Sequence, residues 1–152
     1  MEMVLGQQDL NKAIQMAVMA HADQADKLGK PYILHPLYVM TMMDTIESMI
    51  VAILHDVRED TWLSEDEPIR MMFGDMVADA VAVLTRGKNQ DYDDYIRRIR
   101  KNRLAEQVKR GDLHHNLSEE RLRQLPEEVR IRLRKKYARA FAILNGKETD
   151  GK

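Results

Sequence analysis

A short acidic stretch in the middle of the chain holds the residue types best suited to chemistry. An apolar run, Ile50–Leu54, leads into the adjacent pair His55-Asp56, and Glu59 and Asp60 follow one helical turn later. Imidazole and carboxylate together suit Mn²⁺, Fe²⁺ or Zn²⁺. If the helix continues, residues four apart share a face, so Glu59 lies near His55 and Asp60 near Asp56. The pattern predicts a metal site with two acidic groups that orient or deprotonate its water.

A competing interpretation treats this stretch as a solvated helix end with an incidental His. Carboxylates at a helix C-terminus oppose the macrodipole, so their placement calls for a nearby cation. Two further residues extend the metal hypothesis, although a lone His before a proline or a lone Asp in a basic helix is more often structural. Together the four supply two imidazoles and two carboxylates on three predicted helices, enough for an octahedral site that keeps waters. These candidate ligands are His35, His55, Asp56 and Asp112.

The composition fits a single globular domain. The chain has 152 residues, of which 44% are hydrophobic and 32% charged, so it is long and apolar enough to bury a sizeable core. It contains no Cys, which excludes disulfides and thiolate metal sites and suits a reducing compartment. The start of the chain lacks a basic region and a long apolar run, and no apolar stretch reaches the roughly 20 residues of a membrane span. We expect a cytoplasmic protein without a signal peptide and without membrane contact.

Charge is distributed unevenly along the chain. Residues 1–96 carry 7 basic and 17 acidic side chains, whereas residues 97–139 carry 15 basic and 6 acidic ones. A basic half could face nucleic acid or an acidic partner. Few aromatic residues are interleaved with these charges, which disfavours single-strand binding. We therefore expect solvated faces of two long helices here, with nucleic acid as the lesser alternative, and leave the oligomeric state open.

Every periodic segment of the sequence predicts a helix, and no strand pattern exceeds a few residues. The expected fold is all-α, a compact bundle of helices, with one domain over residues 1–146 and a polar tail over residues 147–152. Particular helix ends are also predicted: Asp9 caps the first helix, Pro36 opens one that runs from Leu37 to about Met43, and Asp44 or Thr45 caps the helix with the His-Asp pair. A break is expected near Lys101-Asn102, and the last helix starts at Gln124-Leu125-Pro126 and ends at Asn145-Gly146.

Beyond these local features, the order of the four candidate ligands resembles the signature of the HD phosphohydrolase superfamily. Further motifs, in the same order, resemble the alarmone hydrolase domain of the RelA/SpoT family, and the likeness is closest to its small stand-alone members. The resemblance covers roughly residues 9–144. The motifs that carry it are His21-Ala22-Asp23-Gln24, the stretch from Lys27 to Pro36, Leu54-His55-Asp56-Val57-Arg58-Glu59-Asp60-Thr61, Leu84-Thr85, the stretch from Val108 to Asn116, and Lys136-Tyr137-Ala138-Arg139-Ala140.

The resemblance implies an HD-domain fold, a catalytic metal and specific roles for site residues. The four ligands would hold one Mn²⁺, with other divalent transition metals as alternatives. Glu59 and Asp60 would stand beside the attacking water. Asn116 would touch the ribose or a phosphate, and Lys27 would lie beside the guanine or the phosphates. The implied reaction removes the 3′-pyrophosphate from (p)ppGpp and releases GDP or GTP.

Two positions depart from the family pattern. Where the longer hydrolases have an arginine packed on guanine, this chain has Asp26, whose carboxylate cannot stack on a base but can accept hydrogen bonds from guanine nitrogens. Base preference therefore stays open, with phosphohydrolysis of NADPH or an adenine alarmone as one alternative and a non-catalytic nucleotide- or RNA-binding module as another. Gly111 replaces a more usual Ala, which we expect to be sterically harmless at a cost of about 1 kcal/mol of helix propensity. His114 and His115 flank the site; we expect partly exposed surface positions, with support of the site by one of them as the alternative.

Overall fold

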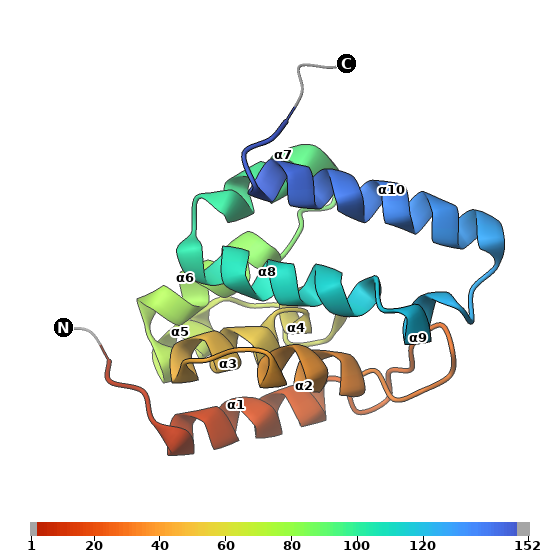
Figure 1. Cartoon of the computed structure of the whole chain (residues 1–152). Coiled ribbons are helices and arrows are strands. Elements are labelled where there is room, and N and C mark those ends of the chain that lie inside the picture. The colour runs from red at the N-terminus through yellow and green to blue at the C-terminus, as the bar shows by residue number, and fades with distance from the viewer. Residues whose placement is uncertain (1–2, 149–152) are drawn as a thin grey trace.

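The computed structural model describes residues 3–148, and these fold into α-helices joined by loops (Figure 1). The prediction of an all-α fold is confirmed: in the described range no strand forms, and pairing is limited to an isolated bridge between Ala25 and Pro31. The helices are α1 (Gln7–Ala20), α2 (Leu34–Thr41), α3 (Ile46–Leu54), α4 (Val57–Asp60), α5 (Glu67–Phe73), α6 (Asp75–Leu84), α7 (Tyr92–Arg100), α8 (Arg103–Asn116), α9 (Glu119–Leu122) and α10 (Glu127–Leu144).

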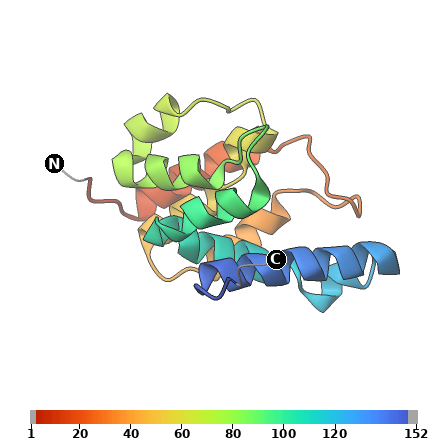
Figure 2. The same cartoon turned by 90° about the horizontal axis from the view of Figure 1, so that it is seen from above.

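Helix α3 forms the centre of the core because its side chains are apolar on every side. Residues 50–54 are completely buried, as expected for a helix surrounded by other helices. Helix α1 packs against α3 through small residues, including Ala13 and Ala17, which allow a close approach. Figure 1 shows α1 below α2 and α3, α8 above them, and α7 and α10 on the far side of α8. Seen from above in Figure 2, α10 extends past the end of α7 toward the loop that precedes α2.

Two predicted helix starts are wrong by one turn. The residue that caps α1 is Gly6, and Asp9 lies inside the first turn, where its carboxylate accepts the Gly6 N–H at 2.9 Å. Helix α2 begins at Leu34 and ends at Thr41, so Pro36 sits inside the first turn and not at its start. Proline is tolerated there because the first four N–H groups of a helix have no partner within it. In both cases the predicted residue lies within the first turn of the helix, a few positions after the residue at which the helix begins.

The helix that carries the His-Asp pair is interrupted, contrary to the prediction of one continuous helix. Thr45 caps α3 as expected, accepting the Ser48 N–H at 3.1 Å. The helix then ends at Leu54, and a single new turn, α4, starts after Asp56. The argument that Glu59 lies beside His55 on one continuous face is therefore wrong in its geometry, although both acidic residues still reach the same cavity, as described below.

Gly111 occupies a tight crossing between α8 and α2, and nothing there contradicts the prediction that glycine in place of alanine is sterically harmless. A Cβ atom at this position would lie 3.0 Å from Met43 Cε and 3.2 Å from Val39 Cγ1. These distances are shorter than an ordinary carbon–carbon contact of about 3.5–4.0 Å. The missing side chain lets α2 and α8 approach closely. This approach matters because His35 and Asp112 face each other across the same two helices.

The C-terminal part of the chain largely follows the predictions. Asn102 caps α8, which places the expected break before that helix, and α10 starts after Pro126. Gly146 follows α10 with φ of 71°, a backbone conformation that favours glycine. Of the predicted tail, residues 149–152 lie outside the described residues. Over residues 3–148, no helix is both long and apolar enough to cross a bilayer.

Candidate metal centre

The four predicted ligands come together where α2, the end of α3 and α8 meet. His35 projects from α2 and Asp112 from α8, and His35 Nε2 lies 2.8 Å from Asp112 Oδ1. Both side chains are buried. Helix α3 brings His55 to the same point, with its Nε2 3.4 Å from the same carboxylate oxygen. Residues 77 positions apart in the sequence thus converge on one buried point.

His55 has one ring nitrogen fixed and the other free to bind a ligand. Its Nδ1–H donates to the carbonyl of Ala52 at 2.6 Å, which leaves Nε2 with a lone pair in the neutral ring. Nε2 is completely buried, and among the described residues it has no partner with hydrogen-bond geometry. Carboxylate oxygens of Asp56 and Asp112 nevertheless lie 3.1 and 3.4 Å away. A buried lone pair between two carboxylates is the environment that a cation would satisfy.

The donor set fits a divalent transition metal. One donor atom each from His35, His55 and Asp56 lies within 4.8 Å of the others, and Asp112 is adjacent to both histidines. Mixed nitrogen and oxygen ligands favour Mn²⁺, Fe²⁺ or Zn²⁺ over Ca²⁺ or Mg²⁺. Four residues also leave room in an octahedral shell for water. The structure therefore supports the predicted ligand set from residues of three separate elements.

Without a metal, the negative charges of Asp56 and Asp112 are compensated in part by a proton on His55. Burial alone would lower the pKa of His55, but Asp56 and Asp112 outweigh it and hold that pKa well above its usual range. Burial would raise the pKa of Asp56, but His55 outweighs it and lowers the value to about 2. A histidinium between two carboxylates is thus the protein's own substitute for a bound cation. Metal binding must release this proton.

Several neighbours hold the two carboxylates in place. The hydroxyl of Tyr32 donates to Asp56 Oδ2. Lys109 Nζ donates to Asp112 Oδ2 at 2.9 Å, and Asn116 Nδ2 donates to Asp112 Oδ1 at 3.2 Å. These contacts fix which oxygen of each carboxylate faces the histidines. They also show that Asn116, predicted one turn after Asp112, does face the same cluster.

Glu59 and Asp60 lie at the open side of the cluster. Both line a cavity of about 260 Å³ together with Asp56 and Asp112. Although their side chains reach solvent, partial desolvation and then the charge of Asp56 raise the pKa of both carboxyl groups. A nearby cation would lower these values again. Both carboxyl groups therefore lie in the cavity that the ligand cluster lines, and their role as proton acceptors stays a prediction.

The same cavity has a basic and aromatic wall that the sequence reasoning missed. It is built from the loop after α6, from α7, from α10 and from Lys109 of α8, the helix that also carries Asp112. The arginine and lysines bring positive charge into the cavity that the two acidic residues also line, whereas the Tyr95 hydroxyl donates to the carbonyl of Leu84 at 2.7 Å. Lys109, Lys136 and Tyr137 lie within motifs that carry the resemblance, but the sequence assigned them no role in a cavity. The wall consists of Arg86, Tyr92, Tyr95, Lys109, Lys136 and Tyr137.

A second cavity of about 270 Å³ adjoins the first through shared residues. Lys27 and Asn116 line it, as predicted for substrate-binding residues, together with Tyr137 and Asp26. Asp26, however, also has a local structural role, because its Oδ1 accepts the N–H groups of Leu28 and Lys30 at 2.8 and 3.0 Å. Only its other oxygen remains available to a ligand.

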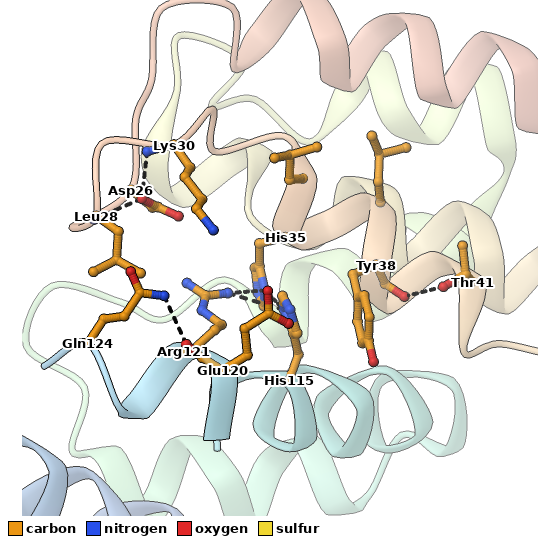
Figure 3. Close-up of a pocket in the computed structure, with 12 residues that line it drawn as sticks. Asp26, Leu28, Lys30, His35, Tyr38, Thr41, His115, Glu120, Arg121 and Gln124 are labelled. Carbon is orange, nitrogen blue, oxygen red and sulfur yellow. Dashed lines mark hydrogen bonds between the residues drawn. The ribbon is translucent and has the colours of Figure 1, made fainter. Parts of the chain in front are cut away.

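A third cavity of about 370 Å³ lies on the other side of His35, shown in Figure 3. Arg121 and His115 form its inner wall and make contact with His35. His114 is exposed, whereas His115 is partly exposed, as expected for this pair, and also contacts a candidate ligand. The sequence left open that one of the two histidines supports the site, and this contact singles out His115.

Comparison with known proteins agrees with this geometry. The model of the HD domain family matches residues 13–111. A guanosine-3′,5′-bis(diphosphate) 3′-pyrophosphohydrolase of Aquifex aeolicus is 36% identical over 83 residues, which are 52% of this chain and 12% of that protein. A GTP pyrophosphokinase of Streptomyces antibioticus is 38% identical over 81 residues, 51% of this chain and 10% of that protein. The chain thus spans only about a tenth of the length of these relatives.

A solved structure provides the comparison over the whole length. It is described as a metazoan ortholog of SpoT that hydrolyzes ppGpp, and it aligns with a TM-score of 0.76 over 97% of this chain and 92% of its own. At 22% identity this likeness establishes a common fold. The family model covers most of the chain and includes three of the four predicted ligands, and it ends one residue before Asp112. On these grounds the chain belongs to the HD domain family.

Proposed function

We propose that this protein is a metal-dependent pyrophosphohydrolase that removes the 3′-pyrophosphate of guanosine alarmones. The observation that carries the proposal is a cavity lined by His35 and four carboxylates together with lysine, arginine and tyrosine side chains, with His55 buried beside Asp56 and Asp112. Such a cavity suits a polyanionic phosphoester held beside an acidic catalytic centre. The matched relatives include a pyrophosphohydrolase of this class, although the matched region is a small part of that protein.

His35, His55, Asp56 and Asp112 would hold the ion, which we propose to be Mn²⁺. When bound, such an ion acts as a Lewis acid toward the phosphate and acidifies water. The protein's own part is to bury the histidines and to fix the carboxylates through Tyr32, Lys109 and Asn116.

The basic wall would bind the pyrophosphate group. Arg86 and Lys136 line the same cavity as Glu59 and Asp60. Burial, followed by the charges of Arg86 and Lys109, lowers the pKa of Lys136. A dianionic phosphate between these cations would relieve their mutual repulsion. The nucleoside would extend into the adjoining cavity, beside Lys27 and Tyr137.

The reaction itself requires a base close to the attacking water. The water oxygen forms a bond to the 3′-linked phosphorus, and the bond from this phosphorus to O3′ breaks. One of Glu59 and Asp60 accepts the water proton, and O3′ receives a proton as it leaves. The products are pyrophosphate and the nucleoside 5′-diphosphate or 5′-triphosphate. Such substrates place the activity in the cytoplasm.

Pyrophosphate release from ppGpp with Mn²⁺, with and without EDTA, tests the proposal. We expect turnover with Mn²⁺, none with EDTA, and none from His55→Ala. A panel with pppGpp, an adenine 3′-diphosphate analogue and NADPH determines the base and the leaving group. Preferential turnover of NADPH or the adenine compound would replace the guanosine assignment. Binding of nucleotides or RNA without any turnover would instead identify a non-catalytic module.

A further inference from the structure

His115 and Arg121 form a cluster against the edge of His35 that faces away from the other candidate ligands. His35 Nδ1 lies 2.8 Å from His115 Nδ1. Arg121 Nη1 lies 2.9 Å from the first of these nitrogens and 3.1 Å from the second. Figure 3 shows the three side chains meeting at the inner wall of the third cavity.

The two imidazole rings meet edge to edge and not face to face. Their planes differ by only 10°, and their centroids are 5.0 Å apart. That separation is what two ring radii and one N···N hydrogen bond add up to when the rings are coplanar. A face of His115 is covered instead by Tyr38, whose ring lies 4.1 Å away at 16°. His115 is therefore held along its edge by two polar groups and across its face by an aromatic ring.

We infer that His115 is a positioning residue that accepts the Nδ1 proton of His35 and thereby turns the His35 Nε2 lone pair toward the metal. Arg121 assists by donating to the same His115 nitrogen. This role rests on the metal centre of the proposed function, but it assigns residues outside the ligand set. In this role, the contact between His35 of α2 and His115 at the end of α8 orients a ligand in addition to packing the two helices.

Counting protons leaves one arrangement that suits a ligand. A neutral imidazole has one N–H and one lone pair. The bond between the two Nδ1 atoms contains one proton, so one ring donates and the other accepts. If His115 donated, His35 Nε2 would carry the remaining proton and could not bind a metal. If His35 donates, its Nε2 is free for a metal, and Arg121, which can only donate, shares with His35 the single lone pair of His115 Nδ1, 3.1 Å away.

The second histidine ligand uses a different acceptor for the same purpose. His55 donates its Nδ1–H to the main-chain carbonyl of Ala52, which no substitution at that position removes. His35 has a side chain in that role. Ligand histidines commonly donate their other N–H to such an acceptor, and removing the acceptor typically weakens metal binding by roughly 10- to 100-fold. The acceptor of His35 can therefore be tested by mutation.

Three variants separate the hydrogen bond from packing. His115→Phe retains an aromatic ring against Tyr38 but has no acceptor, and we expect its Mn²⁺ Kd, measured by titration calorimetry, to rise by about 10- to 100-fold. His115→Asn loses the ring but places an oxygen near the Nδ1 position, and we expect a Kd within about threefold of the unmodified protein. His114→Phe changes the exposed neighbour and should have no effect. Circular dichroism of the metal-free forms shows whether each variant folds.

The outcomes are distinct. If His115→Phe binds Mn²⁺ as the unmodified protein does, or if His115→Asn is as weak as His115→Phe, the inference is wrong while the proposed function stands. If the unmodified protein binds no metal, the metal centre itself is wrong and this inference with it.

A spectroscopic measurement on the unmodified protein decides the matter even if a variant does not fold. Zn²⁺ is diamagnetic, so imidazole ¹⁵N spectra of the Zn²⁺-loaded protein report each nitrogen. We expect a slowly exchanging proton on His35 Nδ1 with a scalar coupling across the hydrogen bond to His115 Nδ1. A proton on His115 Nδ1, or none between the two nitrogens, would overturn the assignment.

Discussion

Lys109 Nζ lies 2.9 Å from Asp112 Oδ2, while the other oxygen of the same carboxylate, Oδ1, faces His35 and His55. Burial alone would lower the pKa of Lys109, but Asp112 outweighs it and keeps the pKa well above its usual range. The lysine is therefore charged and compensates a buried carboxylate. It binds one carboxylate oxygen, whereas the other oxygen, which also accepts from Asn116, faces the two histidines.

Lys109→Met tests this division of roles. Removing one partner of a buried ion pair leaves the other uncompensated, which typically costs 3–5 kcal/mol. We expect the metal-free protein to lose on the order of 3 kcal/mol in urea unfolding, because the histidines still compensate part of the charge of Asp112. The double variant Lys109→Met/Asp112→Asn should recover most of this loss. Equal stability of Lys109→Met and the unmodified protein would show that the pair contributes nothing.

Metal content provides the direct test of the ligand set. His55→Ala and Asp112→Ala each remove one ligand, so both should lose bound Mn²⁺ after gel filtration, as measured by elemental analysis. Binding to the folded state stabilises it by about 2.7 kcal/mol at a metal concentration 100 times the Kd. The rise in Tm on adding Mn²⁺ should therefore vanish in both variants but persist in His114→Ala. Full occupancy in both ligand variants would remove these residues from the centre.

Metal binding should strengthen as pH rises. The pKa of His55 is held well above its ordinary value near 6.5. In the metal-free protein the ring is therefore protonated on both nitrogens at neutral pH. Its ion pairs with Asp56 and Asp112 contribute stability that is complete below the unfolded-state pKa and is lost as pH rises through the folded-state pKa. Metal must displace this proton, so calorimetry in buffers of different ionisation enthalpy should detect proton release. An affinity independent of pH between 6 and 8 (roughly the range in which histidines titrate) would contradict this.

Glu59→Gln and Asp60→Asn test the assignment of the base. Loss of a general base typically costs about 10²–10⁴ in rate, so each variant should lower kcat at least a hundredfold. Neither residue belongs to the proposed ligand set, and metal content should remain unchanged. Loss of metal in one variant would make that residue a ligand. Near-normal kcat in both would show that neither acts as the base.

Asp26 tests how the chain selects the base of its substrate. Asp26→Arg should change the ratio of kcat/KM between guanine and adenine substrates by more than tenfold, about 1.4 kcal/mol. Because Oδ1 of Asp26 also holds the backbone of the following turn, Asp26→Asn is the matched control, since its amide oxygen can accept the same two N–H groups. An unchanged ratio in Asp26→Arg, with the fold intact, would show that this residue does not read the base.

The sequence alone determined the elements and the chemistry of the ligands. Helical periodicity follows from which side chains must be buried, and this is a local property, so the all-α fold and most helices could be predicted. The types and order of His35, His55, Asp56 and Asp112 were likewise visible, and so was the placement of Asn116 one turn after Asp112. The predictions that failed locally, at Asp9, Pro36 and the end of α3, concern helix ends, where several residues compete to cap the same free N–H groups.

Only the tertiary structure decided what stands opposite the ligands. Arg86 and Lys136 reach the cavity from elements that share no motif with the ligands, and His115 meets His35 across 80 positions of sequence. Such contacts depend on how closely whole helices approach, as at Gly111, where the absence of one Cβ brings α2 and α8 together. A residue's own neighbours in the sequence do not encode that distance, because it is set by packing between helices.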